Sequence, residues 1–127
     1  MQTLLPGITA ERVPTRRLYT AVLSVAGRSG QPVLFVHGNV SSSLFWQPAM
    51  LALPEGCRPL ALDLRGFGET DPEPVDATRG LRDYADDLAA LIDALELTSC
   101  TWSAGAWAAA CCCSTSPTGL RRTRPLP

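Results

Sequence analysis

Apolar positions along the chain fall into two kinds of pattern. A continuous apolar run at residues 33–36 and a second mostly apolar run at 60–64, which contains Asp63, each lead into a glycine-containing turn, which is typical of strands buried on both faces of a parallel sheet. Weaker strand patterns precede them at residues 11–15 and 18–25. From 81 to 95, apolar residues recur at three- and four-residue spacing, with acidic residues mostly on the opposite face. This spacing predicts an amphipathic helix.

A second helix is predicted between the two apolar runs. Pro48 suits the first turn of a helix that continues to Leu53, and the serines at 41–43 can cap its start. The resulting order of strand, helix, strand, loop and helix is the beginning of a doubly wound, mostly parallel α/β sheet. We therefore expect the α/β class, with residues 1–97 forming part of such a core.

Composition separates residues 98–127 from the rest of the chain. All 12 acidic residues lie before this segment, which holds three arginines and no Val, Ile, Phe, Tyr or Met. A segment so poor in core-forming side chains has little to offset its ordering entropy. We expect residues 98–127 to be an irregular or disordered tail.

Bulk properties exclude several classes of protein. A net charge of −1 creates no field for nucleic acid or an anionic membrane, and no run of about 18 apolar residues predicts a membrane span. Five cysteines, an odd number without a signal sequence, favour reduced thiols and a cytoplasmic location. Cys111, Cys112 and Cys113 are too close in sequence to converge on one tetrahedral metal. We expect no metal and no cofactor.

Candidate chemistry begins directly after the first apolar run, at His37-Gly38-Asn39. Gly38 lets the backbone turn sharply, and the N–H of Asn39 can then point into the crevice above the sheet, where it would stabilise an oxyanion. The alternative is an ordinary strand-to-loop glycine beside a histidine that satisfies a local hydrogen bond. The three residues alone leave both interpretations open.

Gly66 and Gly68 follow the second apolar run. Their spacing suggests a nucleotide-binding G-x-G-x-x-G turn, but Asp71 stands at the third glycine position and the chain has no phosphate loop. A tight turn that needs small residues explains them at least as well as a catalytic role for Arg65 or Gly66.

Together, these motifs resemble the α/β-hydrolase superfamily over about residues 10–97. The similar features are a P-V-L-F-V-H-G-N strand, a serine-rich turn followed by an aromatic residue, an L-D-L-R-G-F-G strand end, an acidic loop and a helix containing D-D-L. The resemblance implies a small-molecule hydrolase in which a histidine activates a serine and two backbone N–H groups hold the oxyanion. Asn39 would supply one of those groups, and His37 would be structural. Dehalogenase-like and epoxide-hydrolase-like members also carry Asn at this position.

The resemblance breaks where the family has a buried strand ending in a G-x-S-x-G turn. The chain has Thr101-Trp102-Ser103-Ala104-Gly105, so Thr101 replaces the first glycine. Five residues separate Leu97 from Ser103, whereas the family spends about eight on the turn and strand. We expect Ser103 to be a decoy rather than a working nucleophile.

A shift of reading frame explains this break. GC-rich codons from Cys100 onward, read two bases later, permit V-H-L-V-G-W-S-L-G-G-G-V-L-L-Q-Y-L-A-D-R-P, with a complete elbow and its serine at the position of Ala106. Third bases can be chosen freely at many positions. The single codon of Trp107 followed by Ala108 nevertheless forces a glycine where the motif needs one.

These observations predict a catalytically incomplete fragment of a serine hydrolase. His37 is the one histidine in the chain, and the acid that would orient a catalytic base is not identified. The alternative is a non-catalytic interaction module, or a subunit completed by another chain. A partial sheet exposes an edge, which also invites non-specific self-association and marginal folding.

Overall fold

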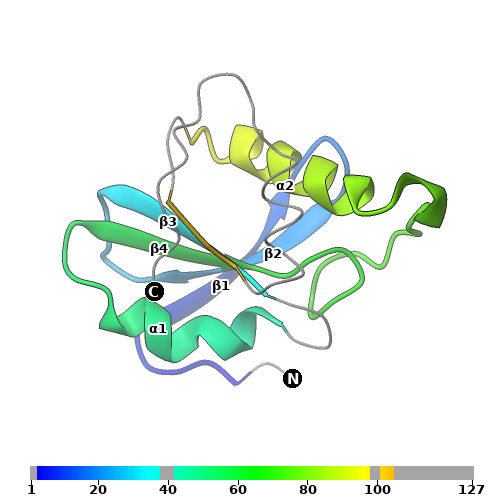
Figure 1. Ribbon diagram of the computed structural model, residues 1–127. Coiled ribbons are helices and arrows are strands. Elements are labelled where there is room, and N and C mark those ends of the chain that lie inside the picture. The colour runs from blue at the N-terminus through cyan, green and yellow to red at the C-terminus, as the bar shows by residue number, and fades with distance from the viewer. Residues whose placement is uncertain (1–2, 38–41, 98–100, 105–127) are drawn as a thin grey trace.

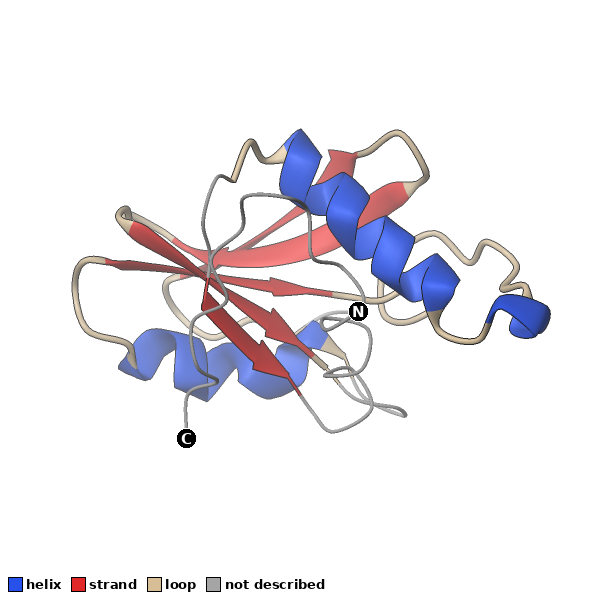
Figure 2. Cartoon of the chain, turned by 45° about the horizontal axis from the view of Figure 1, so that its top comes forward, coloured by secondary structure: helices blue, strands red, loops and turns tan. Residues whose placement is uncertain are grey.

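The computed structural model describes residues 3–37, 42–97 and 101–104. They form one twisted sheet with a helix layer on each side (Figures 1 and 2). In chain order the elements are β1 (Ile8–Pro14), β2 (Tyr19–Val25), β3 (Gln31–Val36), the 3-10 turn η1 (Ser43–Trp46), α1 (Gln47–Ala52), β4 (Cys57–Leu62), the 3-10 turn η2 (Ala77–Arg79), α2 (Arg82–Ala94) and β5 (Thr101–Ala104).

The sheet has the strand order β1-β2-β4-β3-β5. β1 pairs with β2 and β2 with β4 in antiparallel fashion, whereas β4, β3 and β5 run parallel to one another. Leu34 at the centre of β3 lies opposite Leu60 on one side and Trp102 on the other. The predicted α/β class is confirmed, with an antiparallel hairpin added at one edge of the parallel strands.

Two apolar cores lie on opposite faces of the sheet. On the α2 side, Leu34 and Val36 of β3 pack with buried leucines of β4 and α2. On the α1 side, Val33 and Phe35 pack with Met50 of α1 and with apolar residues of β2 and β4. Successive side chains of a strand point to opposite faces, so a strand covered on both sides must be apolar throughout. This arrangement accounts for the unbroken run at residues 33–36.

The predicted elements are present with shifted ends. The first strand, expected at residues 11–15, begins at Ile8 because Gly7, with φ of 90°, turns the chain into it. Leu53 is the C-terminal cap of α1 rather than its last residue, and the long helix spans Arg82–Ala94. Leu53 is apolar like the helix residues before it, so the apolar pattern alone does not show at which residue the helix ends.

Strand β5 lies inside the segment expected to be irregular. Its four residues pair in parallel with residues 33–36. The expectation of irregular chain is therefore wrong for residues 101–104, because pairing with β3 uses backbone N–H and C=O groups and does not require aliphatic side chains. For residues 98–100 and 105–127, the expected tail lies outside the described residues. Within the described part of the chain, no helix is long and apolar enough to cross a membrane.

Candidate functional site

The candidate site lies where the parallel strands β3 and β4 end. Val36 and Leu62 are partners in the register of these strands, so the next residues, His37 and Asp63, leave the sheet at the same edge. Ligands of open α/β sheets bind outside the carboxyl ends of the strands. The two apolar runs of the sequence thus bring the polar residues at their ends to the same edge of the sheet.

His37 is fully buried between the ends of the two strands. Its Nε2 atom accepts a hydrogen bond of 2.9 Å from the backbone N–H of Leu64, and its ring meets the ring of Phe67 edge-on, with centroids 5.1 Å apart. Because Nε2 is the acceptor, the proton of the neutral imidazole belongs on Nδ1. The Nε2 lone pair is therefore engaged, and this geometry suits a structural role.

Asp63 is 1% exposed, and the sequence analysis did not single it out. Its Oδ1 atom accepts a 2.7 Å hydrogen bond from the N–H of Ser43, and its Oδ2 atom accepts one of 3.2 Å from the N–H of Glu69. The carboxylate thus joins the start of η1 to the turn after β4. The available signal was a charged residue interrupting an apolar run, because a buried carboxylate needs strong donors.

Different structural constraints explain why glycine stands at positions 66 and 68, after β4. Gly68 has φ of 52°, and a Cβ placed there would lie 2.2 Å from Oδ2 of Asp63. Gly66 has open space around it but a φ of 76°, which most side chains disfavour. Backbone conformation and close approach to Asp63 account for both residues.

Thr70 fastens the same turn to β2. Its hydroxyl donates to the carbonyl oxygen of Asp63 at 2.7 Å and accepts from the N–H of Ala21 at 2.9 Å. The N–H of Asp63 also donates to the carbonyl oxygen of Ala21 at 3.0 Å. The end of β4 is therefore held on both sides by hydrogen bonds.

Arg65 points away from the strand ends toward α2. Its Nε and Nη2 atoms donate to the two carboxylate oxygens of Asp87, both at 2.7 Å, and its Nη1 donates to the carbonyl oxygen of Pro74 at 2.7 Å. Hydrogen bonding to Asp87 raises the pKa of Arg65 above its ordinary value, and burial only partly opposes this. Arg65 anchors a helix, and nothing in these contacts suggests a catalytic role.

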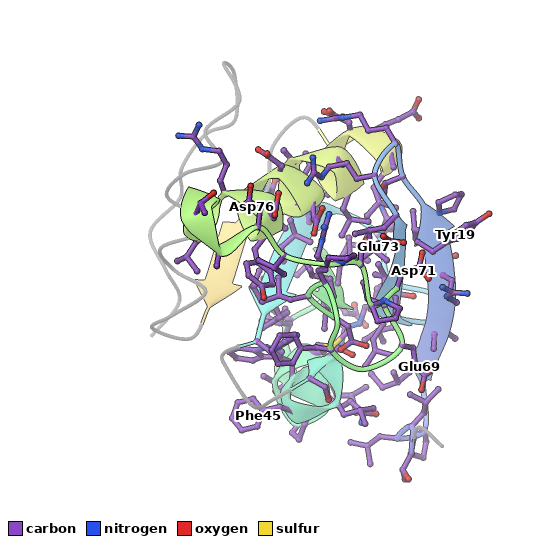
Figure 3. The ribbon with its side chains drawn as sticks, turned by 90° about the vertical axis from the view of Figure 1, so that its right-hand side faces the viewer. Tyr19, Phe45, Glu69, Asp71, Glu73 and Asp76 are labelled. Carbon is purple, nitrogen blue, oxygen red and sulfur yellow. The ribbon has the colours of Figure 1, made fainter. Side chains whose placement is uncertain are left out.

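The acidic loop between β4 and α2 is docked against the hairpin. In Figure 3 it carries Glu69, Asp71, Glu73 and Asp76, with Asp71 near Tyr19 of β2. Asp71 accepts a 2.9 Å hydrogen bond from the N–H of Tyr19 and pairs with Arg12. Among the described residues, no cluster of three or more His, Cys, Asp or Glu could hold a metal ion.

A groove of about 410 Å³ lies elsewhere, over β1 and β2. Its lining includes Arg12, Leu23 and Glu69, and it includes neither His37 nor Asp63. The groove is wide open to solvent and borders the strand ends through Ala21 and Glu69, which hydrogen-bond to Asp63. We therefore keep the carboxyl ends of β3 and β4 as the candidate site.

The remaining predicted site residues are placed only in part. Ser103 lies within β5, opposite Phe35 and before the last strand residue, Ala104. A nucleophile elbow instead puts its serine on the turn that follows a strand. Gly38 and Asn39, the predicted oxyanion turn, lie outside the described residues.

Comparisons with known proteins agree with this architecture. The family model described as "Alpha/beta hydrolase family" matches residues 33–126. An epoxide hydrolase of Siraitia grosvenorii is 40% identical over 68 residues, which are 53% of this chain and 22% of that protein. The match to the family model continues past Leu97, where the motif resemblance ended.

Two solved structures are similar over nearly the whole chain. An epoxide hydrolase from Vigna radiata superimposes with a TM-score of 0.75 and 27% identity, over 90% of this chain and 35% of that one. A haloalkane dehalogenase from Agrobacterium tumefaciens gives a TM-score of 0.77 and 29% identity, over 91% and 40% of the two chains. This chain thus spans well under half the length of these relatives. With the family model matching most of its residues, the chain belongs to the α/β-hydrolase family.

Proposed function

We propose that this chain comes from a hydrolase of ester-like or related small molecules and, as these 127 residues stand, lacks a working catalytic centre. The observation that carries the proposal is the state of His37. It is the one histidine of the sequence, it is buried, and its Nε2 lone pair already accepts the N–H of Leu64. A serine nucleophile needs a histidine free to take its proton.

The part of the mechanism that this chain supplies is half of an oxyanion hole. Asn39 follows the strand end at which His37 and Asp63 lie, and its backbone N–H would face the developing negative charge. The similar proteins are named for epoxides and haloalkanes, which supports a small-molecule substrate. We place the protein in the cytoplasm because the chain has an odd number of cysteines, with Cys57 a free thiol.

The reading frame from Cys100 onward is part of the same proposal. Strand β5 ends at Ala104, so a serine at position 106 would lie two residues after the strand, in the turn where an elbow presents its nucleophile. The alternative frame puts its serine at that position. The family match continues to residue 126 in the present frame, so the sequence of the encoding DNA is needed to choose between the two reading frames. We expect codons that yield G-x-S-x-G two bases later, and codons unable to do so would refute the frame shift.

Hydrolysis of a p-nitrophenyl ester by the purified chain tests the catalytic part. We expect a rate equal to that of the heat-denatured chain, and an unchanged rate in Ser103→Ala. A rate well above that background which is lost in Ser103→Ala would overturn the proposal, because it would make Ser103 a working nucleophile.

A second candidate is a non-catalytic module, or a subunit completed by another chain. It is favoured by β5, which pairs on one side with β3 and has no second partner among the described strands. An unpaired strand edge can accept another strand. A partner of fixed stoichiometry in size-exclusion chromatography after co-purification would support this candidate, and its absence would count against it.

A further inference from the structure

Residues 3–7, which precede β1, form an arm that runs beside α1 (Figure 1). We infer that this N-terminal arm is a releasable strap, and that its release loosens the turn η1 at the edge of the candidate site. The side chain of Gln47 connects the arm to η1. This coupling is a property of the fold and is independent of the catalytic chemistry proposed above.

The two ends of the N-terminal arm are held in different ways. The carbonyl oxygen of Gly7 accepts a 2.9 Å hydrogen bond from the N–H of Ala26, directly after β2. Nearer the N-terminus, Oε1 of Gln47 accepts from the N–H of Leu5 at 2.7 Å, and its Nε2 donates to the carbonyl oxygen of Thr3 at 3.1 Å. The arm is therefore fixed to the sheet at one end and held at the other through one side chain.

Little apolar burial holds the N-terminal arm in place. All five of its residues are exposed, including Leu4 and Leu5, which are 37% and 39% exposed. A segment with few buried apolar contacts opens locally at a much lower free energy than the core. The docked and released arm are therefore two states of one folded protein.

Gln47 makes the state of the arm matter to η1. The residue is both the C-terminal cap of η1 and the first residue of α1, and its backbone N–H donates to the carbonyl oxygen of Leu44. Nε2 of its side chain donates to the same oxygen at 3.4 Å. Because Gln47 is 5% exposed, release of the arm leaves Oε1 and one N–H of the amide buried without their partners. Water must then enter, or the side chain must turn outward and give up its bond to Leu44.

The turn η1 contributes directly to the candidate site. It begins at Ser43, whose N–H donates to Oδ1 of Asp63 at 2.7 Å, and the N–H of Phe45 donates to the carbonyl oxygen of Ser42 at 3.2 Å. A 3-10 turn of four residues has few hydrogen bonds of its own, so loss of support at its C-terminal end weakens the whole turn. The N-terminal arm thus acts on the edge of the site from a position 42 residues away in sequence.

Leu5→Pro tests the strap, because proline lacks the N–H that donates to Gln47. Amide hydrogen exchange of the ¹⁵N-labelled variant is compared with that of the wild type. We expect the amides of Phe45 and Gln47 to exchange about threefold to tenfold faster, as for the loss of one neutral hydrogen bond. The amide of Leu91, which lies in α2 on the other face of the sheet, should keep its protection.

Leu4→Pro is the matched control. The N–H of Leu4 makes no hydrogen bond within the described part of the chain, so its removal should leave the Phe45 and Gln47 amides unchanged. Gln47→Leu provides a second background, in which the side-chain bonds to the arm and to Leu44 are already lost. Adding Leu5→Pro to it should cause no further acceleration at Phe45, because both substitutions break the same connection.

Three outcomes would overturn the strap. They are an unchanged Phe45 amide in folded Leu5→Pro, an equal acceleration in Leu4→Pro, and an acceleration in Leu5→Pro that is shared by Leu91. Should Gln47→Leu fold, an undiminished effect of Leu5→Pro in that background would also overturn it. These measurements need no catalysis, so the strap and the hydrolase proposal can fail independently.

Discussion

Two buried hydroxyl groups near the end of β4 differ in their hydrogen bonding. The Thr70 hydroxyl bonds to Asp63 and Ala21, whereas the Ser43 hydroxyl is buried and has no hydrogen-bond partner among the described residues. Thr70→Val would leave an N–H and a C=O unsatisfied and should lower the free energy of unfolding by about 1–3 kcal/mol. Ser43→Ala removes a buried hydroxyl that makes no hydrogen bond to the described residues, so it should be neutral or slightly stabilising.

Urea denaturation followed by tryptophan fluorescence measures both variants under the same conditions. The Ser43 substitution is the control for removing a buried hydroxyl, because it leaves the backbone N–H that bonds to Asp63 in place. Equal losses in the two variants would show that burial alone, and not the two bonds of Thr70, sets the effect.

At the scale of single residues, the sequence predicted the residues whose role follows from local chain geometry. Gly66 and Gly68 were expected in a tight turn, and their positive φ angles fit that reason. Asp63 and Thr70 were missed because each also depends on a remote partner: Ser43 lies 20 residues from Asp63, and Ala21 lies 49 from Thr70. Pairs this far apart are formed by the packing of strands, which no local pattern records.

At the scale of elements, several carboxylates of α2 pair with arginines, and Asp87 is the one that binds the buried Arg65. Asp87 forms ion pairs with both Arg65 and Arg17. The Nε atom of Arg17 lies 2.7 Å from Oδ1 of Asp87. Asp87→Ala would leave the buried Arg65 without its counter-charge and should lower the free energy of unfolding by about 3–5 kcal/mol. Thermal and urea unfolding would measure the loss.

Asp93→Ala is the matched control for that loss. Asp93 also lies on α2 and pairs with Arg16, but both side chains are more than half exposed. Its removal should change the free energy of unfolding by less than about 1 kcal/mol. A loss in Asp87→Ala no larger than in Asp93→Ala would mean that apolar packing alone holds α2.

The same ion pair predicts behaviour in alkaline solution. Hydrogen bonding to Asp87 raises the pKa of Arg65 in the folded state, so its stabilising contribution is complete below the ordinary pKa of an arginine and is lost only as pH rises through the higher folded value. The stability difference between wild type and Asp87→Ala should therefore stay constant from about pH 7 to about pH 10. Urea titrations across that range test it, and a difference that shrinks steadily would contradict the assignment.

The elements that the sequence predicted are those with a strong apolar pattern. β3, β4 and α2 bury one or two apolar faces, and their side chains carry the signal. β5 was not expected, because its place beside β3 depends on backbone pairing. Conversely, the site itself was only half visible: the histidine and the glycine turn were singled out from the sequence, whereas Asp63, a charged residue within an apolar run, was not.

At the scale of the whole molecule, the two edges of the sheet are unequal. β1 forms one edge and carries exposed Glu11 and Arg12 and a final proline, Pro14, which are features that oppose pairing with another strand. β5 forms the other edge in the described part of the chain and has no charged residue. We therefore expect self-association to proceed through β5.

Sedimentation velocity over a range of concentrations tests this expectation. The wild-type chain should show mass increasing with concentration, and Ser103→Lys should reduce that increase because a lysine on an edge strand disfavours pairing. Thr9→Lys on β1 is the matched control and should leave association unchanged, since Thr9 is exposed on the edge already protected by charge. If both lysine substitutions reduced self-association equally, the cause would be the change in net charge and not the β5 edge. A monomer at every concentration would mean that the free edge of β5 is covered within the chain itself.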